Sequence, residues 1–159
     1  MTQEEKDLLL KDLCSRQLHG VIIDSAEYNE AAYHKHYLQR LISIKTLANK
    51  LVCIDVDDYP DPKIHDWKIE LCKPYLRPMS SMTEEEKKKL KADTCPKGTG
   101  YFDEKYLICP INHYGEHISY EFMSAILEWL NAHHFDYRGL IEKGLALEAP
   151  EGMYDTGIN

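Results

Sequence analysis

Apolar side chains recur at helical spacing near the start of the chain and again over residues 119–132. At the start, Thr2 and Glu5 have the spacing of a capping box, and Gly20 suits the end of the helix that follows. The apolar face of this first helix is formed by Leu9, Leu10, Leu13 and Cys14. Over 119–132 the polar positions form one narrow stripe, which predicts a helix that is buried on most of its surface.

Four short segments between these helices have the alternation or the β-branched content of strands. They are residues 20–24, 36–46, 50–56 and 66–72. Because these segments are short and closely spaced, they predict a small antiparallel sheet or an SH3-like barrel. The pattern over residues 30–50 is also compatible with one helix, and that alternative stays open.

Residues 73–82 and the segment after them predict a linker followed by a charged helix. Pro74 and Pro78 each lack a backbone donor and favour an extended chain. Thr83 and Glu86 then form a second capping box. The helix that they start has Glu–Lys pairs four residues apart but almost no apolar face, so we interpret it as a solvated spacer.

The predicted elements combine into an α+β fold. It has an N-terminal helix, a small antiparallel sheet or SH3-like barrel, and a C-terminal helical hairpin. The hairpin would consist of the helix over 119–132 and a short helix that Asp136 caps and Gly144 ends. We expect residues 1–79 to hold the first helix and the β unit, and residues 80–159 to hold the spacer helix, a loop and the hairpin. A single compact domain is the alternative.

Two adjacent histidines, His133 and His134, lie in the turn between the two helices of this hairpin. With Tyr137 and Arg138 they form a candidate ligand-binding or partner-binding site, because a guanidinium and the free backbone donors of a helix start can hold an anion. The structural alternative is an imidazole at the helix C-terminus, where the helix dipole would raise its pKa. If the rings instead pack in the core, burial would lower their pKa.

A second candidate site combines Cys95, Cys109, His113 and His117, which are all zinc ligand types. Their spacing lacks the close cysteine pair that makes zinc motifs specific. We therefore expect neither metal nor cofactor, and zinc is the alternative. The five cysteines are odd in number and widely spaced, which indicates reduced thiols. Nothing in the sequence has the spacing of a catalytic motif.

The net charge of −8 over 159 residues limits the classes of partner. An acidic chain without a basic patch repels phosphate backbones, so general nucleic-acid binding is not expected. The N-terminus has no signal-peptide pattern, and no apolar run approaches the ~18 residues of a membrane span. These features predict a cytoplasmic protein without a membrane role. They leave the oligomeric state open, a homo-oligomer included.

Three blocks of the sequence resemble a group of short uncharacterised proteins from phages and mobile elements of gut bacteria. The blocks are MTQEEKDLLLKDLC, KPYLRPMSSMTEEE and WLNAHHFDYRGLIEKGLALEAPEGMY. The resemblance implies an accessory role inside a bacterial host cell, and it brings no activity, cofactor or catalytic residue. We therefore expect a non-catalytic accessory protein that binds a host or phage protein or sequesters a small ligand. The alternative is a small metal-stabilised or hydrolytic enzyme that uses cysteine and histidine side chains.

Overall fold

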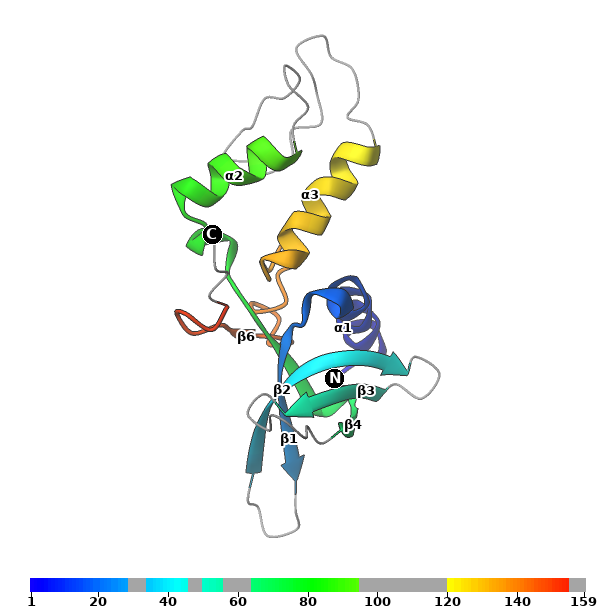
Figure 1. Ribbon diagram of the computed structural model, residues 1–159. Coiled ribbons are helices and arrows are strands. Elements are labelled where there is room, and N and C mark those ends of the chain that lie inside the picture. Colours follow the sequence, from blue (N-terminus) through cyan, green and yellow to red (C-terminus); the bar gives the residue numbers. More distant parts are fainter. Residues whose placement is uncertain (29–33, 46–49, 56–63, 95–119, 155–159) are drawn as a thin grey trace.

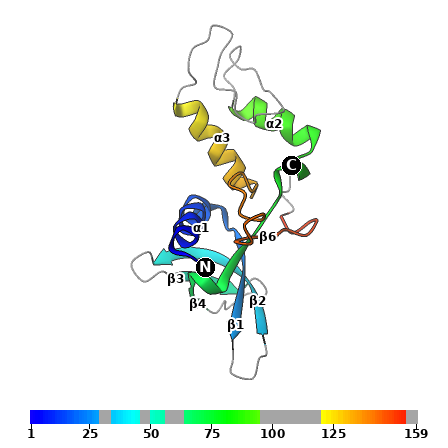
Figure 2. The same ribbon diagram turned by 180° about the vertical axis from the view of Figure 1, so that it is seen from behind.

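The computed structural model describes five stretches of the chain, which are residues 1–28, 34–45, 50–55, 64–94 and 120–154. Together they form an α+β fold, as predicted. Figures 1 and 2 show an elongated molecule, in which a sheet and the N-terminal helix lie at one end and two further helices lie at the other. An extended segment, drawn in green in Figure 1, runs from the sheet toward the helices and includes residues 72–76.

The first helix, α1, covers Gln3–Arg16 and begins as the sequence predicts. The Thr2 hydroxyl accepts a hydrogen bond from the Glu5 backbone at 3.2 Å, and the Glu5 carboxylate accepts one from the Thr2 backbone at 2.6 Å. A 3-10 turn follows over Gln17–His19, and Gly20 then reverses the chain with a φ of 64°. The capping box and the glycine stop are therefore both confirmed.

Six strands form the sheet. They are β1 (Ile22–Tyr28), β2 (His34–Lys45), β3 (Lys50–Asp55), β4 (Ile64–Lys68), β5 (Cys72–Leu76) and β6 (Leu147–Glu148). Their order is β4-β3-β2-β1-β5-β6, and all neighbours are antiparallel except β5 and β6. Since β4 and β6 remain separate edges within the described residues, the sheet is open and the SH3-like barrel is not confirmed. The helix alternative for residues 30–50 is wrong over the described part, 34–45, which is strand.

The first hydrophobic core lies between α1 and one face of this sheet. β2 pairs with β1 along its first half and with β3 along its second half, and a bulge between Leu41 and Ser43 bends it. The core residues are Leu9, Leu13, Val21, Ile23, Leu41, Leu51, Cys53, Ile69, Cys72, Leu76, Leu140, Leu145 and Ala146. Because the last three follow the expected boundary at residue 80, both expected parts of the chain build this core. The division into two parts stays a prediction.

The predicted linker over 73–82 is wrong at its start, because β5 occupies Cys72–Leu76 in the interior of the sheet. Pro74 faces Ile23 of β1 in this pairing. Alternate residues of β5 are buried, which is the pattern of a strand with one face on the core. Proline is rare inside a sheet because it donates no hydrogen bond, and this is why the sequence favoured a linker.

Two helices form a second, smaller core at the other end of the molecule. α2 covers Glu84–Thr94 and α3 covers Tyr120–Ala132, so both predicted helices are confirmed. The core residues are Met82, Leu90, Ile126, Trp129, Leu130 and Phe135. The interpretation of α2 as a solvated spacer is therefore wrong, because Leu90 is fully buried against α3. No helix within the described residues is both long and apolar enough to cross a membrane.

The chain after α3 forms turns, so the short second helix of the predicted hairpin is not confirmed. The Asp136 carboxylate does cap this segment, since it accepts hydrogen bonds from the backbones of Leu140 and Ile141 at 2.9 and 2.8 Å. A regular helix cannot continue through Gly139, whose φ is 67°. The loop expected in the second half of the chain falls within 95–119, outside the described residues.

Candidate functional site

His133 packs against the last turn of α3. Its Nδ1 lies 2.8 Å from the carbonyl oxygen of Trp129, and its ring stacks on the Trp129 indole with 3.7 Å between the ring centroids. Burial lowers the pKa of His133, although the hydrogen bond to Trp129 acts in the opposite direction. The His133 ring therefore contacts a carbonyl at the end of α3, as the structural alternative predicts. Its lowered pKa, however, favours the neutral imidazole.

His134 is buried, with 5% of its surface exposed, and has the left-handed φ of 59° that side chains rarely adopt. Its ring stacks on Tyr154 at 3.7 Å between centroids. Burial, with the nearby Arg16 charge, lowers the pKa of His134 to about 3. The prediction that the helix dipole raises the pKa of these histidines is therefore wrong, because burial lowers it for both. The Nδ1 atom of His134 has no hydrogen-bond partner among the described residues.

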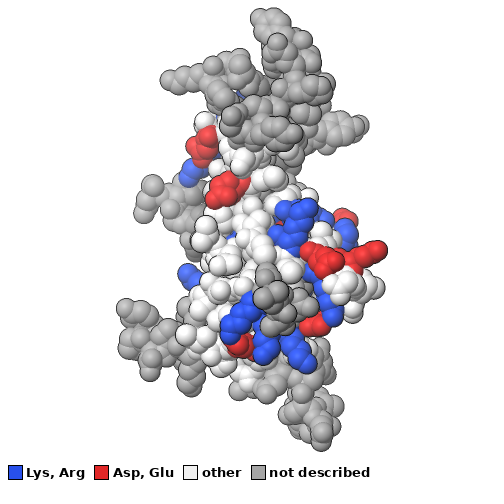
Figure 3. Space-filling model, turned by 90° about the vertical axis from the view of Figure 1, so that its right-hand side faces the viewer, with Lys and Arg blue, Asp and Glu red and all other residues white. Residues whose placement is uncertain are grey.

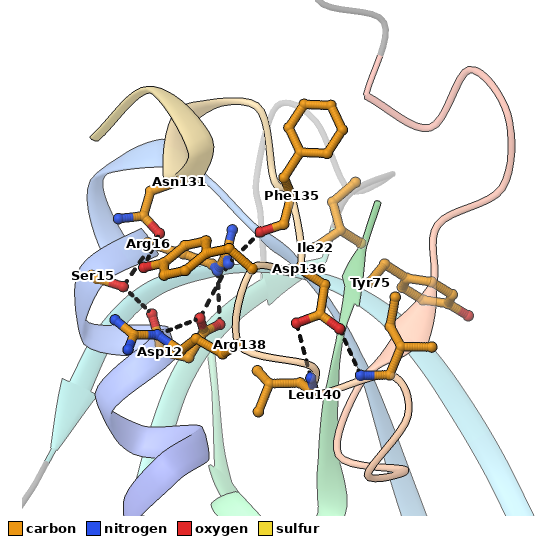
Figure 4. A network of polar contacts seen from close by, with 12 residues as sticks. Asp12, Ser15, Arg16, Ile22, Tyr75, Asn131, Phe135, Asp136, Arg138 and Leu140 are labelled. Atoms are coloured by element: carbon orange, nitrogen blue, oxygen red, sulfur yellow. Dashed lines mark hydrogen bonds and ion pairs between the residues drawn. The ribbon is translucent and has the colours of Figure 1, made fainter. Parts of the chain in front are cut away.

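Arg138 contacts Asp12 of α1 (Figure 4). The Tyr137 ring lies under the Arg16 guanidinium of the same helix, 5.4 Å from Cζ to the ring centroid. The Asp12 carboxylate accepts hydrogen bonds from Arg16 Nε at 2.7 Å and from Arg138 Nε at 3.1 Å. Arg16 also donates to the Phe135 carbonyl at 2.7 Å. Both Asp12 and Arg16 are fully buried, so this network fastens the turn after α3 to the first helix.

The four residues of the candidate binding site therefore do not form one exposed cluster. The Tyr137 hydroxyl donates to Asn131 at 3.0 Å, and the Tyr137 ring lies beside the guanidinium of Arg138, 4.8 Å from centroid to Cζ. Each of the four side chains contacts another part of the chain. Their role in binding a ligand or a partner stays a prediction, and the contacts give each of them a structural role.

A cleft of about 480 Å³ opens beside this junction, between the end of β5 with the start of α2 and the segment after β6. This size is within the usual range for ligand sites. Its lining residues are Arg77, Pro78, Ser81, Thr83, Glu86, Glu148, Ala149, Pro150, Glu151, Gly152 and Tyr154. Tyr154 connects the cleft to the histidine turn, because it lines the cleft and also stacks on His134.

Arg77 and Glu86 form one wall of the cleft. The guanidinium of Arg77 donates two hydrogen bonds to the Glu86 carboxylate, at 2.7 and 3.0 Å, and lies 4.3 Å from the centroid of the Phe135 ring. Burial alone would raise the pKa of Glu86, but the hydrogen bonds from Arg77 and from the Thr83 backbone hold it below its usual value. This wall is therefore rigid, and the charge of Arg77 is neutralised within it.

The opposite wall carries two carboxylates that bind no group among the described residues. The side chains of Glu148 and Glu151 are exposed, and neither makes a hydrogen bond or an ion pair there. Tyr154 fixes this wall to the sheet, because its hydroxyl accepts from the Ile22 backbone at 2.8 Å and donates to the Tyr75 carbonyl at 2.9 Å. Arg77 is paired with Glu86 on the first wall, so Glu148 and Glu151 give the described lining residues a net charge of −2, which suits a cation.

The Ser81 hydroxyl donates to the Pro78 carbonyl at 2.8 Å, and the Thr83 hydroxyl accepts from the Glu86 backbone at 3.2 Å, so both serve the turn before α2. No histidine is among the described residues that line the cleft. What this arrangement can do is hold a positively charged group between two fixed walls.

The predicted zinc ligands Cys95, Cys109, His113 and His117 lie outside the described residues, so the zinc alternative stays untested. Within the part of the chain that the structure describes, no group of three or more His, Cys, Asp or Glu is placed to hold a metal ion. The cysteines described there, Cys14, Cys53 and Cys72, are free thiols. Burial raises the pKa of Cys53 to about 12, which keeps it protonated and unreactive.

Sequence reasoning missed the cleft because its walls come from two distant segments. One local signal was present, since Pro78 follows Arg77 and Pro150 separates the two exposed glutamates. Prolines fix φ and hold such walls in place, but they do not show that the two walls face each other. The family models, the curated proteins and the solved structures compared with this chain contain no match to it.

Proposed function

We propose that this chain is a non-catalytic binding protein, an accessory factor that acts inside a bacterial host cell on a host or phage protein. The cleft receives a lysine or arginine side chain from an exposed segment of that partner. The observation that carries the proposal is the pair of exposed carboxylates, Glu148 and Glu151, in a cleft with fixed walls. The wider role as a phage or mobile-element protein rests on the sequence resemblance alone.

The rigidity of the cleft supports binding, since a preformed site loses little entropy when a ligand enters. Arg77 is held by Glu86, and Tyr154 is held by two hydrogen bonds to the sheet and by the His134 ring. An entering cation would meet Glu148 or Glu151 without first displacing a partner from the described part of the chain. The Tyr154 ring adds an aromatic surface of the kind that attracts cationic groups.

The size and polarity of the cleft favour a side chain or short peptide over a small apolar ligand. Charged, hydroxyl and backbone groups make up most of its lining, and its apolar members are small or are prolines, apart from Tyr154. Small-molecule sites are typically lined by hydrophobic and aromatic side chains.

Selection from a random peptide display library tests the proposal. Peptides recovered with the wild-type protein should be enriched in lysine and arginine, and their binding should weaken at high salt. The double charge reversal Glu148→Lys with Glu151→Lys should abolish that enrichment. The matched control is Glu85→Lys with Glu142→Lys. It reverses two exposed carboxylates elsewhere that form no ion pair with the described residues, and it should leave the selection unchanged. Equal loss in both variants, or a selection without cationic peptides, would overturn the proposal.

A further inference from the structure

Three lysines lie side by side across three neighbouring strands. Lys45 of β2 pairs directly with Lys50 of β3, and Lys50 pairs directly with Lys68 of β4. Residues that pair directly across strands project from the same face of a sheet, so the three ammonium groups share one face. We call this set the lysine row, and it runs perpendicular to the strands.

The lysine row is only partly neutralised by nearby acids. Asp66 binds Lys45 at 2.6 Å, and Glu70 binds Lys6 of α1 and interacts electrostatically with Lys68. Lys50 also interacts electrostatically with Asp66, but the side chains of Lys50 and Lys68 make no ion pair or hydrogen bond with the described residues. Figure 3, which faces the end of the sheet where β2 leads to β3, shows Lys and Arg side chains gathered there with Asp and Glu side chains among them.

This arrangement opposes the stability of the sheet. Like charges placed directly opposite each other on paired strands are destabilising. A lysine on an edge strand protects against unwanted pairing, which explains Lys68 on β4. It does not explain Lys50 and Lys45, which lie on the inner strands β3 and β2. Because the chain as a whole has a net charge of −8, we interpret this local row of positive charge as a surface for an anionic partner.

We propose that the lysine row docks an acidic segment of a partner protein. Ile64 shares the face of Lys68 and is 68% exposed, so the surface offers an aliphatic contact as well as positive charge. Asp66 and Glu70 lie among the lysines and would repel the closely spaced phosphates of a nucleic acid or an anionic membrane. A polypeptide can place its carboxylates at the lysines and an apolar side chain at Ile64.

Binding of defined probes tests this second surface. The probes are a labelled peptide of four glutamates, the same peptide extended by two leucines, a DNA duplex, and vesicles that contain phosphatidylserine. The leucine-extended peptide should bind most tightly of the four. The double substitution Lys50→Gln with Lys68→Gln should weaken its binding about tenfold, as expected for the loss of two exposed ion pairs. The melting temperature should stay the same or rise, because like-charge repulsion is removed.

The matched control is Lys88→Gln with Lys89→Gln on α2, where both lysines are exposed, and it should leave binding unchanged. Tighter binding of DNA or of vesicles than of either peptide would overturn the proposal. So would equal loss of binding in the control pair. A homo-oligomer that the lysine-row variant dissociates would identify a second copy of the chain as the occupant instead.

Discussion

Asp12 is the residue on which the junction between the two ends of the molecule depends. Among the described residues, it is the carboxylate that both Arg16 and Arg138 contact. Arg16 is fully buried, and its Nη1 atom has no partner of its own there. A buried guanidinium without a counter-charge is strongly unfavourable, so the stability of the turn after α3 rests on this one carboxylate.

The substitution Asp12→Asn should therefore lower the free energy of unfolding by about 3–5 kcal/mol, because it leaves Arg16 buried without a negative partner. Urea denaturation followed by circular dichroism measures this change. Glu84→Gln, which removes an exposed ion pair with Lys87, serves as the control and should change stability little. A loss as small as that of the control would show that the network is not needed for stability.

His134 should make the protein sensitive to mild acid. Its pKa is about 3 in the folded chain and about 6.5 in the unfolded chain, so only the unfolded chain takes up a proton between these values. The stability that the neutral His134 contributes to the fold is fully present above about pH 6.5 and is lost as the pH falls toward 3. Between pH 7 and pH 5 the free energy of unfolding should fall by about 2 kcal/mol from this residue.

Denaturation of His134→Asn at both pH values checks this expectation, since asparagine tolerates the left-handed backbone and does not titrate. The variant should be less stable than wild type at pH 7, because the stacking on Tyr154 is lost, and should lose less stability on going to pH 5. The same pH dependence in His134→Asn as in wild type would contradict a buried neutral imidazole.

Elements set by nearby residues could be predicted from the sequence, and those set by distant contacts could not. Both capping boxes and the strands β1 to β4 follow from signals within a few residues. β5 was missed because Pro74 is unusual inside a sheet, and only its pairing with Ile23 reveals the strand. α2 has one strongly apolar position, Leu90, so its packing on α3 left almost no periodic trace.

Leu90→Ala measures whether α2 is a packed element or a solvated spacer. Leu90 is fully buried in the second core, so the truncation should reduce the free energy of unfolding by about 2–5 kcal/mol. Lys88→Ala on the exposed side of the same helix is the comparison, and it should have little effect. An unchanged midpoint of urea unfolding for Leu90→Ala would restore the interpretation as a spacer.

At the scale of the whole molecule, two surfaces of opposite charge lie on different parts of the fold. The cleft is next to the start of α2 and the segment after β6, and the lysine row lies at the end of the sheet where β2 leads to β3. The sequence led us to expect a binding role for the histidine turn, which stays a prediction. It could not reveal the cleft, because only tertiary contacts place the segment of Glu148 and Glu151 opposite Arg77 and Glu86. Taken together, the two proposals describe an adaptor that holds a cationic and an acidic partner segment at once.

A nuclear magnetic resonance titration tests most directly whether the cleft binds a cationic segment. A short peptide of alternating lysine and alanine is added to the nitrogen-15-labelled protein. Saturable shifts are predicted for the backbone amides within residues 77–86 and 148–154, apart from Pro78 and Pro150, which have no amide proton. Glu148→Lys with Glu151→Lys should remove these shifts. The claim would be contradicted if those amides stayed unshifted, or if the shifts centred on the acidic first turn of α1 instead.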